Sequence, residues 1–289
     1  MKKLFITGLL LSCVIWTANT SGQSKNDPLR VLVTVGNHDF EEPLFWAMLD
    51  ALPGIEYTTL DLHEAMTACD HLTIVNGKPV YDCKLPPAAS TLAPGLAEKF
   101  DVVLRYDMLD PWPAAQQQLF QDLLNTEPGI GFLSLHHNIA AHSQWPEWKK
   151  IIGGKYVFED EIIDRKQYRQ TITSGIEKPI DMRIKVVDDK HPITSGVSDF
   201  DSLDELYNNI YLADDIHVLL TTDHPDGDRR YAHDGGFDPA MAWTTSYGAS
   251  RIFYLRIGHH SDAWATPEFH KIITQGLRWA ACGSNKNLC

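Results

Sequence analysis

The sequence predicts an α/β protein in which helices flank a parallel sheet that carries an antiparallel extension. Residues 30–35 form a continuous apolar run, residues 40–52 repeat apolar side chains with a helical period, and residues 55–60 form a second apolar run. This order of strand, helix and strand is typical of parallel α/β folds. Residues 166–172 and 181–187 instead alternate polar and apolar side chains, which indicates antiparallel strands.

The same reasoning places the remaining elements. They are strands at 100–106, 129–135, 240–245 and 251–255, and helices at 111–124, from about 138, and at 267–281. Residues 61–97 are less regular and indicate an insertion at the sheet edge, with a hairpin turn at Asn76-Gly77. We expect a single domain over residues 23–289.

The N-terminus has the pattern of a secretory signal peptide. Lys2 and Lys3 precede an apolar run over residues 4–16, and small or polar residues follow. We therefore expect residues 1–22 to be removed, with cleavage just before Gln23 and export to the periplasm or outside the cell. The run is too short to favour a membrane span. Cys13 lies in a loose lipoprotein-type box, but the apolar run continues past it, which favours soluble export.

Composition excludes several classes of partner. The chain has 289 residues, of which 44% are hydrophobic, and its net charge of −13 becomes −15 once Lys2 and Lys3 are removed. An acidic protein is disfavoured as a binder of nucleic acid or of anionic membranes, whereas a neutral sugar is compatible. The sequence contains neither Gly-x-Gly-x-x-Gly nor a Walker loop, so no nucleotide cofactor is expected.

Four cysteines remain after cleavage: Cys69, Cys83, Cys282 and Cys289. An even number in an exported chain suggests disulfides. Cys69 and Cys83 flank the predicted hairpin, and Cys282 and Cys289 lie close together near the C-terminus. We expect these two pairings, with four free thiols as the alternative. The absence of a C-x-x-C pair disfavours a cysteine zinc site.

Two histidine pairs follow two predicted strands. His136 and His137 come directly after the strand at 129–135, and His259 and His260 follow the strand at 251–255. Ligands of open α/β sheets bind outside the carboxyl ends of the strands. One pair alone would be read as ordinary loop histidines, but two pairs with the same placement favour a functional site.

A carboxylate and a further histidine complete the candidate set. Glu205 lies in a polar segment, and His38 follows the first strand. Histidine acts as acid, base or metal ligand near neutral pH, and two histidines with a carboxylate suit Zn²⁺ or a similar divalent ion. The candidate metal ligands are therefore His136, His259 and Glu205.

Plainer roles compete with these functional ones. Glu205 could be a surface or helix-start carboxylate, Arg256 a member of an ion pair, and Trp145 part of the core, although an exposed tryptophan can stack on a sugar ring. A nucleophile is not evident, since no Gly-x-Ser-x-Gly elbow occurs and no mature cysteine follows a predicted strand. Acyl-enzyme chemistry is therefore disfavoured.

The chain resembles the ThuA-like (trehalose utilisation) family. The matching segments run in the family's order through residues 30–281: 129–136, 145–154, 191–196, 204–207, Trp243, 247–259 and 277–280. The family is similar in fold to class I glutamine amidotransferases, which have a flavodoxin-like parallel sheet. In those relatives a nucleophilic cysteine occupies a strand-to-helix elbow. Here that place falls at about His136, so their thiol chemistry is not carried over.

The resemblance implies a role in sugar metabolism, with oxidised (3-keto) glycosides or disaccharides as substrates. A ketone at C3 acidifies the proton at C2, so a base can remove it before the C1 leaving group departs. Such lyase or hydrolase chemistry needs a base, an acid and an electrophile. We expect His136 or Glu205 as the base, His259 as the acid, and Arg256 or a bound divalent metal ion as the group that stabilises the enolate.

We also expect His38, His137, Tyr207 and Trp145 to contact the sugar substrate. Two other functions remain open. The first is a non-catalytic carbohydrate-binding module of an exported sugar-utilisation system, in which aromatic residues bind and the histidines are structural. The second is a metallohydrolase that acts on ordinary glycosides.

Overall fold

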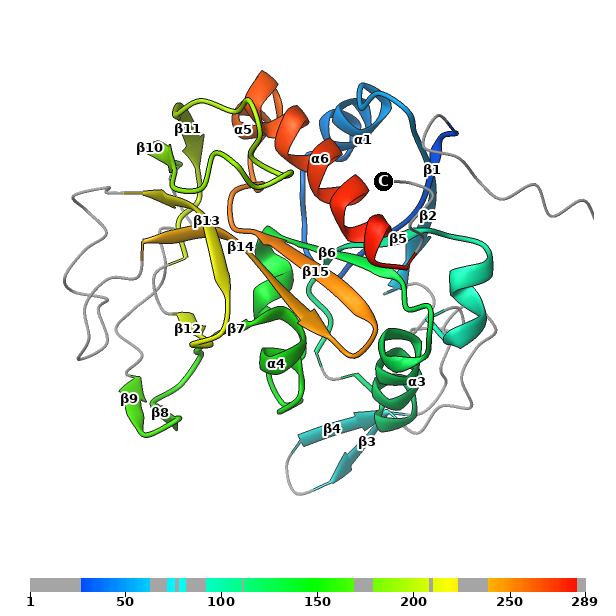
Figure 1. The fold of residues 1–289 in the computed structure, drawn as a ribbon. Helices are drawn as coiled ribbons and strands as arrows, with labels where there is room; N and C mark the ends of the chain where they lie inside the picture. The colour runs from blue at the N-terminus through cyan, green and yellow to red at the C-terminus, as the bar shows by residue number, and fades with distance from the viewer. Residues whose placement is uncertain are drawn as a thin grey trace, which may run out of the picture.

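A nine-stranded sheet with helices on both faces forms the centre of the molecule (Figure 1). The computed structural model describes residues 27–62, 72–75, 78–81, 92–110, 112–168, 179–207, 210–222 and 239–284. The strands of the large sheet lie in the order β11-β10-β13-β14-β15-β6-β5-β1-β2.

Five adjacent strands make up the parallel half of this sheet. They are β1 (Leu29–Gly36), β2 (Ile55–Asp61), β5 (Val102–Asp107), β6 (Gly131–Leu135) and β15 (Ser250–Leu255). Each neighbouring pair among them is parallel. Counted along the chain, their spatial order is 2-1-3-4-5, which is the flavodoxin-like order. The predicted fold class is thus confirmed.

The antiparallel extension is also present. It consists of β14 (Ala240–Tyr247), β13 (His217–Thr222), β10 (Ile180–Val186) and β11 (Phe200–Asp204). These strands pair antiparallel from β15 outwards.

Three smaller strand pairs lie outside the large sheet. They join β7 (Gly154–Tyr156) to β12 (Ile210–Leu212), β8 (Glu161–Ile163) to β9 (Lys166–Tyr168), and β3 (Leu72–Val75) to β4 (Lys78–Tyr81). The β3–β4 pair flanks Asn76-Gly77, as the hairpin prediction requires.

Helices cover the two faces of the sheet (Figure 1). One face carries α1 (Glu42–Asp50), α5 (Ser261–Trp264) and α6 (Pro267–Ser284), and the other carries α3 (Ala114–Asn125) and α4 (Trp148–Ile152). A short 3₁₀ helix, η2 (Pro94–Glu98), packs near α3.

The strands are continuous apolar runs because both of their faces are buried. In β1, alternate residues from Leu29 to Val35 pack into the core under α1 and α6, while Leu32 packs into the second core with α3 and α4.

The helix predicted from about Asn138 is instead a 3₁₀ turn, η3 (His136–Ala140). The Asn138 side chain is buried and bonded back to the strands, because its amide nitrogen donates to the Asp107 carbonyl (2.7 Å) and its oxygen accepts from the Ser134 hydroxyl (2.8 Å). These bonds hold the chain against the sheet after β6, and the next α-helix, α4, begins at Trp148.

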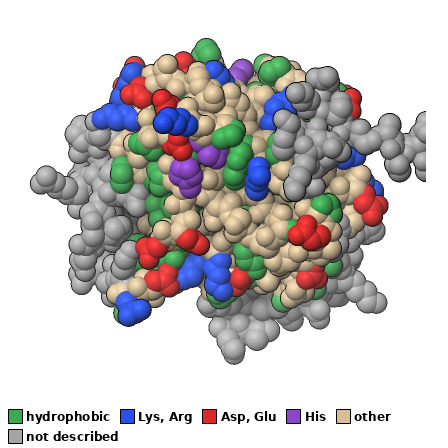
Figure 2. Space-filling view, viewed as in Figure 1, with side chains coloured by type: hydrophobic (Ala, Val, Ile, Leu, Met, Phe, Trp, Pro, Cys, Tyr) green, Lys and Arg blue, Asp and Glu red, His purple; other side chains and the backbone are tan. Residues whose placement is uncertain are grey.

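Acidic and basic side chains are interspersed over the face that Figure 2 shows, so the negative net charge does not form one continuous field on that face. Among the described residues, we find no helix with the length and hydropathy needed to cross a membrane.

Candidate active site at the strand ends

Histidines from three separate strand ends meet at one edge of the parallel sheet. His38 follows β1, His136 and His137 follow β6, and His259 follows β15. The ring of His136 lies 5.8 Å from that of His137 and 5.3 Å from that of His259, and the ring of His38 lies 4.0 Å from that of His137. The convergence expected of parallel strand exits therefore holds for these residues.

His136 forms a sharp elbow where β6 passes into η3. Its φ of 48° lies in the left-handed region, which costs a non-glycine residue on the order of 1–3 kcal/mol and persists only when surrounding contacts hold it. The Tyr254 hydroxyl donates to the His136 carbonyl (2.9 Å), and His136 Nδ1 donates to the Arg256 carbonyl (2.5 Å). The elbow thus turns the His136 ring towards β11 and β15.

His136 and Glu205 form a buried ion pair. His136 Nε2 lies 3.1 Å from Glu205 Oε2, and their side chains are 0% and 3% exposed. Because Nδ1 already donates to a carbonyl, Nε2 can donate to the carboxylate only if the ring is protonated. Burial alone would lower the pKa of His136, but the bond to Glu205 and the charges of Asp204 and Glu205 outweigh it and raise that pKa. Burial alone would raise the pKa of Glu205, but the hydrogen bond to His136 and the charges of the neighbouring histidines together outweigh it and lower that pKa.

The Asp204 carboxylate ties the site together. It is fully buried and accepts backbone N–H groups from Glu205 (2.8 Å), His259 (3.0 Å) and His260 (3.1 Å), and from Gly258. Burial raises the pKa of Asp204, while the His136 charge and these N–H groups oppose the rise. One side chain at the end of β11 therefore places both Glu205 and the loop that carries His259.

Gly258 allows the loop after β15 to pack closely against Leu135 and to reach Asp204. Its φ is 139°, and a Cβ at this position would lie 2.9 Å from Leu135 Cδ1. Its carbonyl accepts both the Tyr106 hydroxyl and Trp264 Nε1, each at 2.9 Å. The loop between β15 and α5 is thus held at its backbone from two sides.

His259 lies between the His136–Glu205 pair and the solvent. Its Nδ1 lies 3.5 Å from Glu205 Oε2, which is an ion-pair distance but longer than a hydrogen bond, and its side chain is 20% exposed. Burial, followed by the His136 charge, lowers its pKa to about 4.

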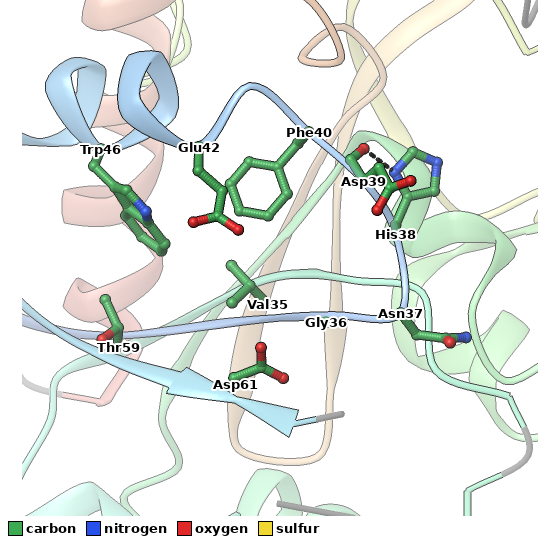
Figure 3. Close-up of a pocket in the computed structure, with 10 residues that line it drawn as sticks. All are labelled: Val35, Gly36, Asn37, His38, Asp39, Phe40, Glu42, Trp46, Thr59 and Asp61. Carbon is green, nitrogen blue, oxygen red and sulfur yellow. Dashed lines mark hydrogen bonds between the residues drawn. The ribbon is translucent and has the colours of Figure 1, made fainter. Parts of the chain in front are cut away.

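His137 and His38 are held by backbone carbonyls. His137 Nε2 donates to the Tyr106 carbonyl (3.1 Å), and His38 Nδ1 donates to the Asp39 carbonyl (2.7 Å), as Figure 3 shows for His38. Burial is the main cause that lowers the pKa of both residues, and the pKa of His137 is lowered more because this residue is fully buried. The His137 ring stacks on the His38 ring and therefore lies within the histidine group.

A cavity of about 600 Å³ opens at the ends of β1 and β2, beside His38 (Figure 3). Its polar lining includes Asn37, His38, Asp39, Glu42, Thr59 and Asp61, and its aromatic lining is Phe40 and Trp46. This volume lies within the range of small-molecule sites.

The other predicted site residues are placed differently. The Tyr207 ring packs 4.7 Å from the His136 ring. The guanidinium of Arg256 donates to the Ala240 carbonyl (2.7 Å) on β14, so the residue meets His136 through its backbone. Trp145 lies among Trp112, His142 and Trp148 and lines a separate cavity of about 410 Å³ that none of the four site histidines lines.

Sequence reasoning did not assign a role to several residues that build this site. They are Tyr106, Asp204, Tyr254, Gly258 and Trp264. Two of them had a local signal, because Asp204 directly precedes Glu205 and Gly258 directly precedes His259 at a strand exit. Tyr106 and Tyr254 act through bonds to carbonyls more than 100 residues away in the sequence, which no local spacing reveals. Trp264 bonds to a carbonyl six residues before it, but its spacing matches no motif.

A family model described as trehalose utilisation (ThuA) matches residues 64–280, which is well over half of the chain. The chain therefore belongs to the ThuA family, and membership points to a role in sugar metabolism. No curated protein shows significant similarity to the sequence.

Solved structures support the same fold. A ThuA-like protein from Parabacteroides merdae is 17% identical, with a TM-score of 0.62 over 90% of this chain and 92% of that chain. A ThuA-like protein from Bacteroides uniformis is 16% identical, with a TM-score of 0.57 over 90% and 94%.

Replacing Asp204 by asparagine should lower the free energy of unfolding by about 2–4 kcal/mol, because an amide NH₂ would face a backbone donor that now meets a carboxylate oxygen. Urea unfolding measures the loss. Asp201→Asn is the matched control, since Asp201 lies on the same strand, is 81% exposed and pairs with Arg183 at the surface. It should change stability by less than about 0.5 kcal/mol, and equal losses for both variants would contradict the role given to Asp204.

Proposed function

We propose that this protein is an exported enzyme that cleaves oxidised (3-keto) glycosides or disaccharides by acid–base chemistry. The observation that carries the proposal is the buried His136–Glu205 pair, which lies next to His259 at the strand ends. Because the pKa of Glu205 is lowered, its carboxylate is ionised at neutral pH and available as a proton acceptor.

In this proposal Glu205 is the base. It takes the C2 proton of a 3-keto sugar, and the electron pair of the C–H bond forms the enolate. Loss of the C1 substituent breaks the C1–O bond and leaves an enone, and Glu205 can return its proton to the departing oxygen. Addition of water to the enone then gives net hydrolysis. Glu205 is almost buried, so the proton reaches it directly after a small movement or through one water.

His136 is a positioning residue here. Both of its ring nitrogens are engaged, with the Arg256 carbonyl and with Glu205, and its side chain has no exposed surface. Its charge and its hydrogen bond orient the carboxylate. The acid role predicted for His259 is not retained, because its pKa of about 4 leaves it unprotonated at neutral pH and Glu205 can supply the proton.

The cavity beside His38 supplies room for the sugar. Trp46 offers an apolar ring against which a pyranose can pack, and the neighbouring carboxylates, hydroxyl and amide can bond to sugar hydroxyls. Because Trp145 lines a different cavity, Trp46 is the better candidate for this contact. The ThuA family's link to sugar metabolism agrees with such a ligand.

Export is supported by two observations. The signal-peptide pattern precedes residue 23, and Cys282 is disulfide-bonded, which is typical of an oxidising compartment. Cys69, Cys83 and Cys289 lie outside the described residues, so the predicted pairings remain predictions.

N-terminal sequencing of protein from the native cell should start at Gln23, and a chain that retains Met1 in the cytoplasm would contradict export.

Turnover of a nitrophenyl 3-keto-glucoside tests the reaction. The wild type should release nitrophenol from it and not from the unoxidised glucoside. Glu205→Gln should lower kcat by about 100-fold or more, because a positioned base typically contributes 10²–10⁴-fold. Glutamine keeps the size of the side chain and an acceptor for His136, and thermal unfolding of each variant checks that it folds.

Glu147→Gln is the control, since Glu147 is a surface carboxylate bonded to Lys150 and Tyr247. It should retain wild-type kcat. Equal turnover by wild type and Glu205→Gln would remove Glu205 from the mechanism. Glycan binding without turnover of either glucoside would instead indicate a carbohydrate-binding module, and hydrolysis of the unoxidised glucoside would indicate an ordinary glycosidase.

A further inference from the structure

Three histidines direct candidate ligand atoms at one place. His38, His137 and His259 each offer a ring nitrogen that lies within 4.8 Å of the other two. The His38 and His137 rings stack with their centroids 4.0 Å apart, and the His259 ring meets the His38 ring edge-on at 5.4 Å. A shift of about 1 Å would bring such atoms to the spacing of ligands around one ion with bonds of about 2.0–2.1 Å.

Hydrogen bonds decide which nitrogen is available on two of these rings. A carbonyl oxygen can only accept, so the proton of His137 sits on Nε2, which faces the Tyr106 carbonyl, and the proton of His38 sits on Nδ1, which faces the Asp39 carbonyl. The lone pairs of His137 Nδ1 and His38 Nε2 are therefore the ones left for a ligand. Metal-binding histidines characteristically donate their other ring nitrogen to such a carbonyl.

Two buried nitrogens in this group have no hydrogen-bond partner among the described residues. They are His137 Nδ1 and His259 Nδ1. His137 is completely buried, so an unsatisfied nitrogen there costs on the order of 1–3 kcal/mol. Unpaired buried groups of this kind call for a water or an ion, and three converging imidazoles favour an ion over a single water.

The alternative set of ligands, His136, Glu205 and His259, also lies within 4.8 Å. An ion there would have to displace the existing bond between His136 Nε2 and Glu205 Oε2. His136 Nδ1 cannot substitute, because it donates to the Arg256 carbonyl. The His38, His137 and His259 set needs no such exchange.

We propose that His38, His137 and His259 form a site for one divalent transition-metal ion of the Zn²⁺ class, with an open coordination position towards the cavity beside His38. Three imidazole ligands with an open position are typical of catalytic rather than structural zinc. His38 belongs both to this set and to the cavity wall (Figure 3), so a bound sugar would lie next to the ion.

Ion binding by these residues is independent of the reaction. Only the ion's use rests on the proposed function: a divalent ion supplies Lewis acidity that polarises a ketone oxygen. The enolate-stabilising role considered for Arg256 would then belong to the ion, which agrees with the bond of the guanidinium to the Ala240 carbonyl.

The test measures metal binding without any turnover. The full mature chain, prepared without a histidine tag, is stripped with a chelator, equilibrated with Zn²⁺ and analysed for metal, and Co²⁺ is added in parallel to record its visible absorption. We expect about one ion per chain and a Co²⁺ spectrum of nitrogen ligation. His137→Ala and His38→Ala should each weaken Zn²⁺ binding by about 100-fold or more, since even the loss of outer-shell partners costs 10–100-fold.

Two further variants separate this site from its alternatives. Glu205→Gln should keep one ion per chain. If the ion were instead bound by His136, Glu205 and His259, this variant would lose it. His191→Ala is the matched histidine control, because His191 lies near His217 at the surface of the antiparallel extension. Thermal unfolding shows which variants fold, and His38→Ala, in a loop, serves if His137→Ala does not.

The proposal is overturned if wild-type protein binds no Zn²⁺ tightly, if His38→Ala and His137→Ala bind as wild type does, or if Glu205→Gln alone loses the ion. Loss of turnover by Glu205→Gln with the ion retained would support the two proposals separately. A bound ion with no turnover of either glucoside would support the metal site and reject the reaction.

Discussion

The site depends on one buried carboxylate, that of Asp204. It lies where the outermost strand of the antiparallel extension ends, and it accepts N–H groups from Glu205 and from the loop after β15. The strands β11 and β15 are not neighbours in the sheet, so these bonds bridge the two halves of the fold. Hydrogen bonds to a charged group are among the stronger ones in proteins, and here they bring a carboxylate and a histidine from distant segments together.

The histidine-rich edge then divides into two parts. His136 and Glu205 form a charged pair whose hydrogen bonds are satisfied, held by an elbow in the left-handed region. His38, His137 and His259 instead leave nitrogen atoms directed at one another. The first part is suited to moving a proton and the second to holding an ion, and Glu205 lies close to both because it is 3.5 Å from His259.

The sequence predicted the fold and the edge at which the site lies, because strand and helix periods and the position of residues after strands are local properties. It placed His136 at the elbow, and it grouped His136, His259 and Glu205 correctly in space. It could not show that His137 turns inwards, since that follows from the 3₁₀ turn and from the bond to the Tyr106 carbonyl. Asp204 stands next to Glu205 in the sequence, but its role as an acceptor could not be predicted, because most of its partners lie 54 to 56 residues away.

The most direct measurement is the anomalous scattering of a crystal of Zn²⁺-loaded protein, recorded at the zinc absorption edge. We expect one strong peak within bonding distance of His38, His137 and His259, with the His136–Glu205 bond intact beside it. A peak between His136 and Glu205, or no peak at the strand ends, would contradict the division of this edge into a proton-transfer pair and a metal site.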